Sequence, residues 1–314
     1  MENTRTKTTR NSLILLLTAA IWGMAFVSQS KGMDYMHPFT FNGVRSLIGA
    51  ASILVYILIS RKIAGDKAAP LDWKLNVKAG LLCGIFLTIA STLQQFGIKY
   101  TSVGKAGFIT TLYIIVPMFG IFLKKKVAPV VWAAAVMAAV GMYLLCMTES
   151  LRLGAGDIMV FLCAIAFAIQ IMTVDHYAAR IDGAVVSCIQ FTVCGVVCCI
   201  GALIWGQPTF GQLQEGLGAL LYAGVLSCGV GYTLQIVGQK GLNPTVAALI
   251  MSLESVIATI SGWIAYKIGF LTTDQTLTDR QIAGCVIVFA AVILVQLPPE
   301  WFRFGKKNAS IKNA

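Results

Sequence analysis

Two ionisable side chains stand deep inside long apolar stretches of this chain. Glu254 lies about ten residues into the apolar segment 244–266, and Arg45 lies about six residues into segment 39–60. If both segments are helices across a bilayer, a rise of 1.5 Å per residue puts Glu254 about 15 Å deep, near the midplane, and Arg45 about 9 Å deep. An ionisable group at the centre of such a helix costs roughly 2.5 to 3.5 kcal/mol, so both side chains need a partner, a wet cavity or a function.

Three roles for the buried carboxylate are open from the sequence. A lone carboxylate at the midplane can exchange a proton with one side of the membrane at a time, as coupling to a proton gradient requires. It can instead be a structural charge that pairs with Arg45, because an arginine side chain is long enough to span the difference in depth. The third role is direct contact with a substrate.

Glutamines form a second layer of polar side chains in the apolar segments. Gln94 and Gln95 lie near the end of segment 79–99, and Gln235 lies near the end of segment 216–239. Gln190 is shallow in its segment, as Arg45 is in its own. We predict that these side chains line a polar cavity between the helices.

Three aromatic residues complete the predicted site. Tyr113 takes the position in the first half of the chain that Glu254 takes in the second half, and Trp22 and Tyr222 could supply aromatic walls. The predicted residues for substrate binding or coupling are Trp22, Arg45, Gln94, Gln95, Tyr113, Gln190, Tyr222, Gln235 and Glu254.

The elements that must position these residues are membrane helices. The chain has a mean hydropathy of +0.80 with only 12% charged residues, whereas soluble domains have about 25%. A bilayer of about 30 Å needs about 20 mostly apolar residues per helix. We therefore predict an all-α membrane protein with ten transmembrane helices at 12–30, 39–60, 79–99, 105–123, 128–147, 157–178, 184–205, 216–239, 244–266 and 281–297.

The second five segments repeat the order of the first five. Leu93, Gln94, Gly97, Lys99, Ala106, Ile109 and Leu112 precede, by 141 positions, Leu234, Gln235, Gly238, Lys240, Ala247, Ile250 and Leu253. Arg45 precedes Gln190 by 145 positions. An odd number of spans per repeat turns the second copy upside down, so we predict two inverted five-helix repeats, 1–150 and 151–314. Such repeats are typical of transporters that alternate access around a midplane site.

The positive charge of the chain reports orientation in the membrane. The net charge is +11, and most of the 24 lysines and arginines fall in the connections on the side of the amino terminus. The positive-inside rule then predicts that both termini are cytoplasmic. This excess needs no nucleic acid as a partner. We expect a multi-pass protein of the plasma membrane, which in a bacterium is the inner membrane; the sequence leaves the oligomeric state open.

Catalytic and metal sites find little support. His37 and His176 are expected in solvated connections, and the chain has no HExxH, phosphate loop or nucleophile elbow. Cys194 and Cys198 share a helix face, but no histidine or carboxylate accompanies them. We read the nine cysteines as small buried apolar residues. We expect no enzyme activity, no metal and no cofactor.

Three stretches carry a family resemblance. The stretch 94–117 (QQFGIKYTSVGKAGFITTLYIIVP), the stretch 156–190 and the stretch 248–266 (ALIMSLESVIATISGWIAY) resemble EamA-type proteins of the drug/metabolite transporter superfamily. The resemblance implies ten helices in two inverted repeats, a central cavity and transport of small polar or amphipathic solutes. Gln94, Arg45, Gln190, Gln235 and Glu254 match recurrent family positions.

Two features depart from the family pattern. Ser255 follows Glu254 where a proline is common, and the stretch after Tyr266 is longer than the usual short turn. On the resemblance, we expect a secondary transporter that exports small organic metabolites such as amino acids by alternating access, with protons as a candidate coupling ion. An uncoupled facilitator, or a channel-like permease for small solutes, is the alternative.

Overall fold

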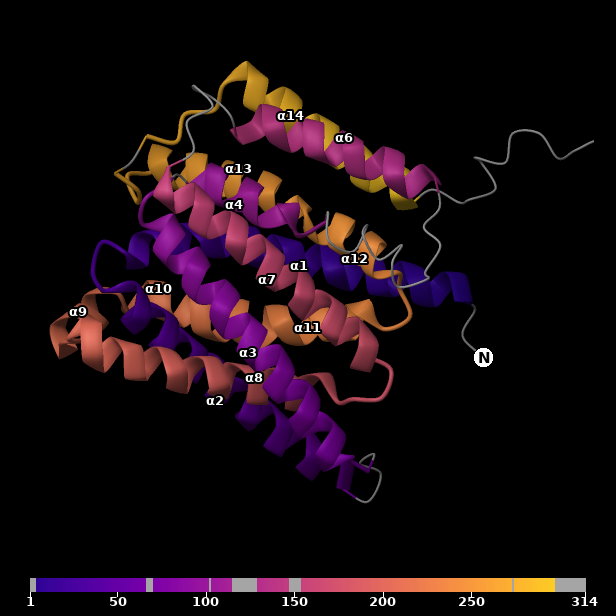
Figure 1. Cartoon of the computed structure of the whole chain (residues 1–314), viewed down its shortest axis with the longest axis vertical. Coiled ribbons are helices and arrows are strands. Elements are labelled where there is room, and N and C mark those ends of the chain that lie inside the picture. The colour runs from indigo at the N-terminus through magenta and orange to yellow at the C-terminus, as the bar shows by residue number, and fades with distance from the viewer. Residues whose placement is uncertain are drawn as a thin grey trace, which may run out of the picture.

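The structure is a computed structural model that describes residues 4–65, 70–101, 103–114, 129–146, 154–272 and 274–296. Every regular element in these ranges is a helix (Figure 1). The elements are α1 (Thr4–Gly32), α2 (Pro38–Ala64), α3 (Trp73–Ile98), α4 (Val103–Thr111), η2 (Leu112–Ile114), α6 (Pro129–Cys146), α7 (Ala155–Tyr177), α8 (Gly183–Gly201), η4 (Ala202–Gly206), α9 (Phe210–Glu215), α10 (Leu217–Leu221), η5 (Tyr222–Gly231), α11 (Tyr232–Gln239), α12 (Pro244–Met251), α13 (Leu253–Lys267) and α14 (Asp279–Gln296).

Membrane-length helices dominate the described chain. Seven helical stretches are long and apolar enough to cross a membrane: Thr8–Gly32, Pro38–Ala64, Trp73–Ile98, Ala155–Tyr177, Gly183–Gly206, Leu217–Gln239 and Val246–Lys267. Shorter helices occupy the other three predicted segments. The part of segment 105–123 beyond Ile114 lies outside the described residues, so the predicted count of ten spans stays a prediction.

The helices pack in pairs that are far apart in sequence. α6 lies beside α14 at one edge of the molecule, and α2 packs on α8 toward the opposite edge (Figure 1). Between these edges, α1 packs on α13 and α7 packs on α3. The two halves of the chain therefore interleave, and each half supplies helices to the centre.

Two glycines allow close helix crossings. A Cβ on Gly97 would overlap Val160, and a Cβ on Gly238 would lie 2.7 Å from Leu15 Cδ2. The first contact joins the end of α3 to the start of α7, and the second joins the end of α11 to the first half of α1. Small residues at such crossings let the two helices approach closely.

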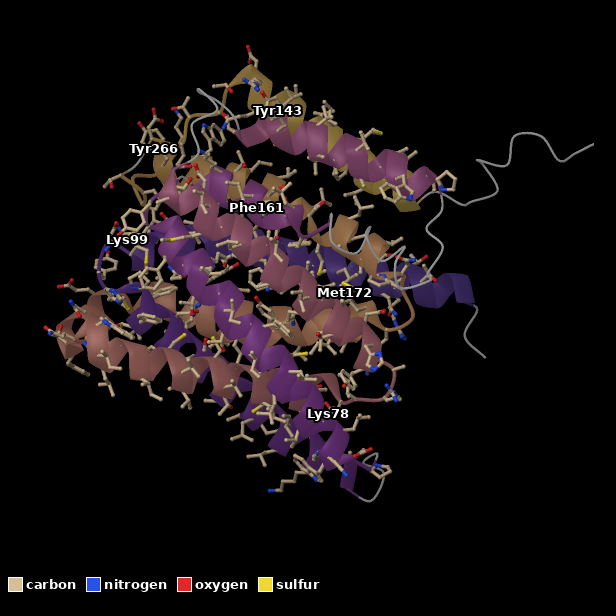
Figure 2. The ribbon with its side chains drawn as sticks, in the orientation of Figure 1. Lys78, Lys99, Tyr143, Phe161, Met172 and Tyr266 are labelled. Atoms are coloured by element: carbon tan, nitrogen blue, oxygen red, sulfur yellow. The ribbon has the colours of Figure 1, made fainter. Side chains whose placement is uncertain are left out.

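The molecule has two ends, which Lys78 and Lys99 mark on α3 (Figure 2). We call the end with the α1–α2, α3–α4 and α8–α9 connections the Lys99 end. The end with the α2–α3, α7–α8 and α11–α12 connections is the Lys78 end. At the Lys78 end, Asp72 and Asp182 cap α3 and α8 by accepting hydrogen bonds from backbone amides.

The predicted span 216–239 is not one regular helix. It begins with α10, widens into η5, a ten-residue π-helical segment, and ends with α11. The π segment contains Gly224, Gly229 and Gly231, and it carries Ser227 and Cys228. π-helical turns often occur at functional sites. A hydrophobicity pattern has no means of predicting this change of helix type.

Candidate functional site

A cavity of about 40 Å³ lies among the central helices. Six predicted residues line it: Trp22, Arg45, Gln94, Tyr113, Gln235 and Glu254. The lining also includes polar or aromatic residues that we did not predict, namely Phe26, Gln29, Ser91, Thr110, Phe167, Gln170, Phe191, Ser227 and Tyr232. Each water molecule needs about 10 to 15 Å³ of cavity volume, so this cavity holds a few waters at most.

Arg45 and Glu254 face this cavity without forming an ion pair. Arg45 is 5% exposed and Glu254 is 3% exposed. Within the described part of the chain, no ion pair joins Arg45 to Glu254, and Glu254 Oε1 has no hydrogen-bond partner. The structure therefore does not form the Arg45–Glu254 pair that we considered from the sequence.

Arg45 is held from behind by a buried polar cluster. Its Nε donates a hydrogen bond to Asn42 Oδ1 at 3.0 Å, and its guanidinium carbon lies 5.5 Å from the centre of the Phe41 ring. The amide of Asn42 in turn donates to Ser91 Oγ at 3.0 Å and to Cys198 Sγ at 3.2 Å. These contacts fix the Nε side of the guanidinium group and leave its two terminal nitrogens toward the cavity.

The cysteines at this place are more than apolar filling. Cys194 Sγ accepts a hydrogen bond from Ser46 Oγ at 3.4 Å and lies 3.4 Å from Ser91 Oγ. Thr92 Oγ1 lies 3.4 Å from Cys198 Sγ. Cys194 and Cys198 are buried in the hydrophobic core, as we expected, and both thiols also contact the polar cluster behind Arg45.

Three buried glutamines form a chain of amides at the cavity wall. Gln235 Nε2 donates to Gln170 Oε1 at 3.4 Å, and Gln170 Nε2 donates to Gln190 Oε1 at 3.3 Å. Gln94 Nε2 donates to Thr110 Oγ1 at 3.2 Å on another part of the wall. Gln170 is the member that we missed. The available signal in the sequence was its position as a single glutamine inside a strongly apolar segment.

Three predicted residues do not line the cavity. Gln95 follows Gln94, but successive side chains on a helix differ by about 100° in direction, and Gln95 Nε2 donates to the Gln29 carbonyl at 3.3 Å. Tyr222 donates its hydroxyl to the Ile21 carbonyl at 3.1 Å. Gln190 reaches the cavity only through Gln170.

Aromatic rings form one side of the cavity. The rings of Trp22 and Tyr232 lie 4.6 Å apart between centroids, and those of Phe191 and Tyr232 lie 4.9 Å apart. Trp22 Nε1 donates to the Ser227 carbonyl at 3.4 Å, which fixes the indole against η5. The cavity thus combines a carboxylate, a guanidinium, amides and aromatic faces, which suits a small polar or amphipathic organic solute.

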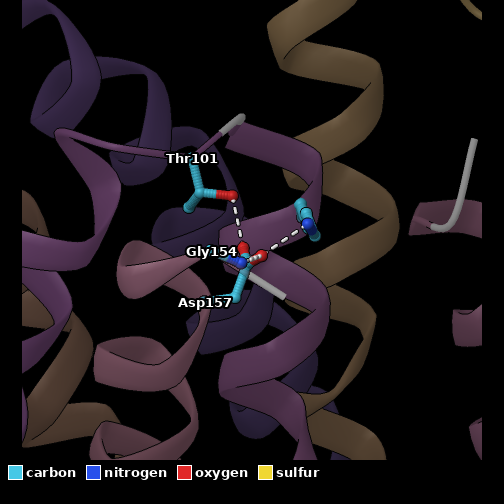
Figure 3. A network of polar contacts seen from close by, with 4 residues as sticks. Thr101, Gly154 and Asp157 are labelled. Atoms are coloured by element: carbon cyan, nitrogen blue, oxygen red, sulfur yellow. Dashed lines mark hydrogen bonds and ion pairs between the residues drawn. The ribbon is translucent and has the colours of Figure 1, made fainter. Parts of the chain in front are cut away.

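An ion pair closes the Lys99 end near the cavity. Asp157, at the start of α7, accepts from Lys105 Nζ at 2.6 Å, from Thr101 Oγ1 at 2.9 Å and from the Gly154 amide at 2.9 Å (Figure 3). Asp157 is 4% exposed. It ties the α3–α4 connection and α4 to the start of α7, although neither Asp157 nor Lys105 was among our predicted residues.

The histidines lie apart from the cavity. His176 is exposed, as we expected, but His37 is half-buried and its Nδ1 accepts from the Phe39 amide at 3.3 Å. Burial, together with the charge of Lys99, lowers the pKa of His37 below its ordinary value of 6.5. Within the described part of the chain, no group of three or more His, Cys, Asp or Glu residues could hold a metal ion.

Comparisons with known proteins agree with this architecture. An uncharacterized transporter of Archaeoglobus fulgidus is 27% identical over 290 residues, which cover 90% of this chain and 84% of that protein. The uncharacterized transporter YwfM of Bacillus subtilis is 24% identical over 293 residues, covering 92% and 94%. A solved structure titled "Crystal structure of protein" has the same fold, with a TM-score of 0.71 at 16% identity, and covers 92% of this chain and 98% of its own.

A family match identifies the chain more directly. The EamA-like transporter family matches residues 10–147 and 154–297. The relatives described above are named transporters, and the long apolar helices agree with a multi-pass protein in a lipid bilayer. The chain belongs to the EamA-like transporter family.

Proposed function

We propose that this protein is a secondary transporter that exports small organic metabolites such as amino acids by alternating access, with Glu254 as the carrier of a coupling proton. The observation that carries the proposal is the buried cavity that Arg45 and Glu254 share without pairing. A buried charge is costly unless it is paired. Two opposite charges that stay apart at one cavity are therefore available to bind a solute and a proton.

Paired contacts support the two inverted repeats, 1–150 and 151–314. Gly97 meets Val160, and Gly238 meets Leu15. Position 238 is 141 residues after 97, and position 160 is 145 residues after 15. The same contact therefore recurs with the roles of the two halves exchanged, as two inverted copies require. A cavity near the junction of such copies suits alternating access.

The size of the cavity supports a conformational cycle. A volume of about 40 Å³ has room for a few waters, so a solute with several heavy atoms needs the cavity to widen. Rocking of one repeat against the other would widen it from one side at a time. We place the protein in the plasma membrane, the inner membrane of a bacterium, with both termini cytoplasmic, because the basic residues gather on that side.

Transport in proteoliposomes tests the proposal. Vesicles containing the purified protein are loaded with a mixture of the twenty common amino acids, and efflux of each is followed by mass spectrometry with and without an imposed pH gradient. We expect the gradient to accelerate the efflux of a subset of them in wild type. In Glu254→Gln, the efflux should no longer respond to the gradient.

A matched control separates the site from general damage. Glu215→Gln makes the same change at an exposed position at the end of α9 and should transport like wild type. Efflux of the same solutes without any response to the gradient in wild type would instead favour the uncoupled facilitator. An equal gradient response in wild type and Glu254→Gln would overturn the role of Glu254.

A further inference from the structure

A second and larger hollow lies at the Lys78 end, away from the central cavity. It is a groove of about 590 Å³ between the ends of α2 and α11, the start of α3 and the α7–α8 connection. Its walls include Ser60, Arg61, Arg180, Asp182 and Lys240. None of the residues predicted for the central site lies in this groove.

The equivalent place at the Lys99 end is filled by aromatic rings. Phe39 stacks on Trp205 with 5.6 Å between ring centroids, and it meets Phe96 edge-on at 5.1 Å. His37 lies 5.5 Å from Phe96 and 5.8 Å from Phe39. These four rings come from the start of α2, the end of α3 and the segment that follows α8.

The groove exists because these rings have small or charged equivalents at the Lys78 end. With the repeat offsets of 145 and 141, Phe39 corresponds to Ala184 and Phe96 corresponds to Val237. Trp205 corresponds to Ser60 at the end of α2, and His37 corresponds to Asp182; both His37 and Asp182 are the N-cap residues of their helices. Equivalent backbone positions therefore carry aromatic rings at the Lys99 end and smaller or charged side chains at the Lys78 end.

The charges around the open groove favour an anion. Arg61, Arg180 and Lys240 line it from three different elements. The two acids of its wall already bind helix amides: Asp72 Oδ1 accepts from Leu75 N at 3.0 Å, and Asp182 Oδ1 accepts from Ala184 N at 2.9 Å. Arg180 and Lys240 each donate one longer hydrogen bond, of 3.4 Å, to a backbone carbonyl. The described wall therefore carries one more positive than negative charge, which matches one phosphodiester group.

The groove also borders an exposed apolar surface of α2. Tyr56 and Ile57 form its apolar side, and Tyr56 is 60% exposed. Ile59 and Ile63 continue the exposed apolar surface of α2. A molecule in this groove would contact the basic side chains on one side and the apolar surface of α2 on another.

We infer that this groove binds an anionic phospholipid, with its phosphate at Arg180 and Lys240 and an acyl chain along α2. Basic residues at the membrane surface attract anionic headgroups, and basic pockets between transmembrane helices hold them. The aromatic cluster gives the opposite end a built-in filling, whereas the Lys78 end takes its filling from the bilayer. The inference does not depend on the substrate of the central cavity.

Native mass spectrometry of the full chain tests the lipid site. The protein is transferred from nanodiscs of mixed phosphatidylglycerol and phosphatidylcholine, and the retained lipid is identified and counted. Wild type should retain phosphatidylglycerol in preference to phosphatidylcholine. Because each basic residue near the surface contributes about 1 kcal/mol, the double variant Arg180→Gln/Lys240→Gln should lose about tenfold or more of this preference.

Two further variants sharpen the result. Lys31→Gln/Lys99→Gln removes two cations at the opposite end and should keep the preference. Ala184→Phe/Ser60→Trp places rings at the positions equivalent to Phe39 and Trp205 and should exclude the lipid without a change of charge. If this filled variant does not fold, the charge variant still decides the question.

Two outcomes would overturn the inference. One is equal retention of phosphatidylglycerol in wild type and in Arg180→Gln/Lys240→Gln. The other is full displacement of the lipid by millimolar glycerol phosphate, since that result would assign the groove to a soluble phosphate.

Discussion

The two ends of the molecule are held together by different chemistry. At the Lys99 end, a buried aspartate binds a lysine, a threonine and a backbone amide, and four rings fill the space between helices. At the Lys78 end, hydrogen bonds to neutral oxygens join the elements. Asn11 Nδ2 donates to the Lys240 carbonyl at 2.7 Å, the Asp182 amide donates to Asn76 Oδ1 at 2.9 Å and Lys240 Nζ donates to the Ile181 carbonyl at 3.4 Å, and a groove stays open beside them. The two ends therefore differ in the kind of contact that joins their helices, with a buried ion pair at one end and hydrogen bonds to neutral oxygens at the other.

This difference bears on a transport cycle. Alternating access requires that each end open in turn, and we expect the end joined by hydrogen bonds to neutral oxygens to need less free energy to open than the end joined by a buried ion pair. A charged, hydrogen-bonded network is stronger than a neutral bond. In the state described, we therefore expect the Lys99 end to be the more firmly closed one.

The largest effect should come from the ion pair at the Lys99 end. Asp157→Ala removes three hydrogen bonds of a buried carboxylate, so it should destabilise the protein by about 2 to 3 kcal/mol. Asn11→Ala, at the Lys78 end, removes one neutral bond and should cost about 1 kcal/mol. Thermal unfolding in detergent compares the two. Equal losses would contradict the difference in closure between the ends.

The glycine crossings should differ in a related way. Gly97→Ala puts a Cβ against Val160 and 2.8 Å from the Gly156 carbonyl, which belongs to the backbone and yields little. Gly238→Ala meets Cδ2 and Cγ of the flexible Leu15 side chain, and the backbone carbonyl of Asn11 is farther away, at 3.2 Å. Overpacking costs about 1 to 3 kcal/mol, and we expect Gly97→Ala near the top of this range. A greater loss in Gly238→Ala, measured by thermal unfolding, would break the comparison.

A change of filling should make the ends more alike. Phe96→Val gives the Lys99 end the residue that the Lys78 end has at position 237, and it removes two ring contacts of the aromatic cluster. Aromatic pairs contribute about 0.5 to 1.5 kcal/mol beyond their buried area, so stability should fall by about 1 to 2 kcal/mol. Val237→Phe fills part of a groove and should leave stability nearly unchanged. The reverse order in calorimetry would show that the rings are not a structural filling.

The smallest effect should be a pH dependence that is confined to the Lys99 end. The pKa of His37 is lowered in the folded protein, so the unfolded chain takes up its proton first as the pH falls. His37 therefore does not reduce the free energy of unfolding above pH 7. As the pH falls through about 6.5, its protonation in the unfolded chain lowers this free energy. Lys99→Gln removes one cause of the lowered pKa and should weaken this decline. An unchanged melting temperature between pH 7.5 and 5.5 in wild type would contradict the expectation.

Much of the helical fold could be predicted from the sequence. Long apolar runs predict helices because backbone groups in a bilayer must be satisfied within the segment. Some helices start and end close to the predicted bounds: segment 39–60 corresponds to Pro38–Ala64, and segment 157–178 corresponds to Ala155–Tyr177. Others differ more, since α1 begins at Thr4 and not at 12, and α3 begins at Trp73 and not at 79. The π segment was not readable, since it depends on how η5 packs against α1 and α2.

The site was readable only in part, for reasons of direction and packing. Glu254 and Arg45 stood out because charges at depth are costly, and both line the cavity. Gln95 was chosen with Gln94, but one step along the helix turned it toward Gln29. Gln170 and Tyr232 were missed, because a sequence shows that a residue is in a helix and not which neighbours its side chain meets.

The groove shows what the repeat alone leaves open. In the sequence alone, the repeat offset of 145 pairs Phe39 with Ala184 and Ser60 with Trp205. That these exchanges leave a groove of about 590 Å³ follows only from the positions of four helical segments around them. Sequence symmetry therefore locates equivalent positions, and the structure reports where they differ in volume and charge.

The central claim is that Glu254, unpaired in the shared cavity, carries a proton during transport. The most direct measurement is the number of protons moved per solute, from a pH-sensitive dye trapped in proteoliposomes while solute efflux is counted. The account predicts a fixed proton movement with each solute in wild type and none in Glu254→Gln, with Glu215→Gln like wild type. Proton movement of equal size in Glu254→Gln would contradict it.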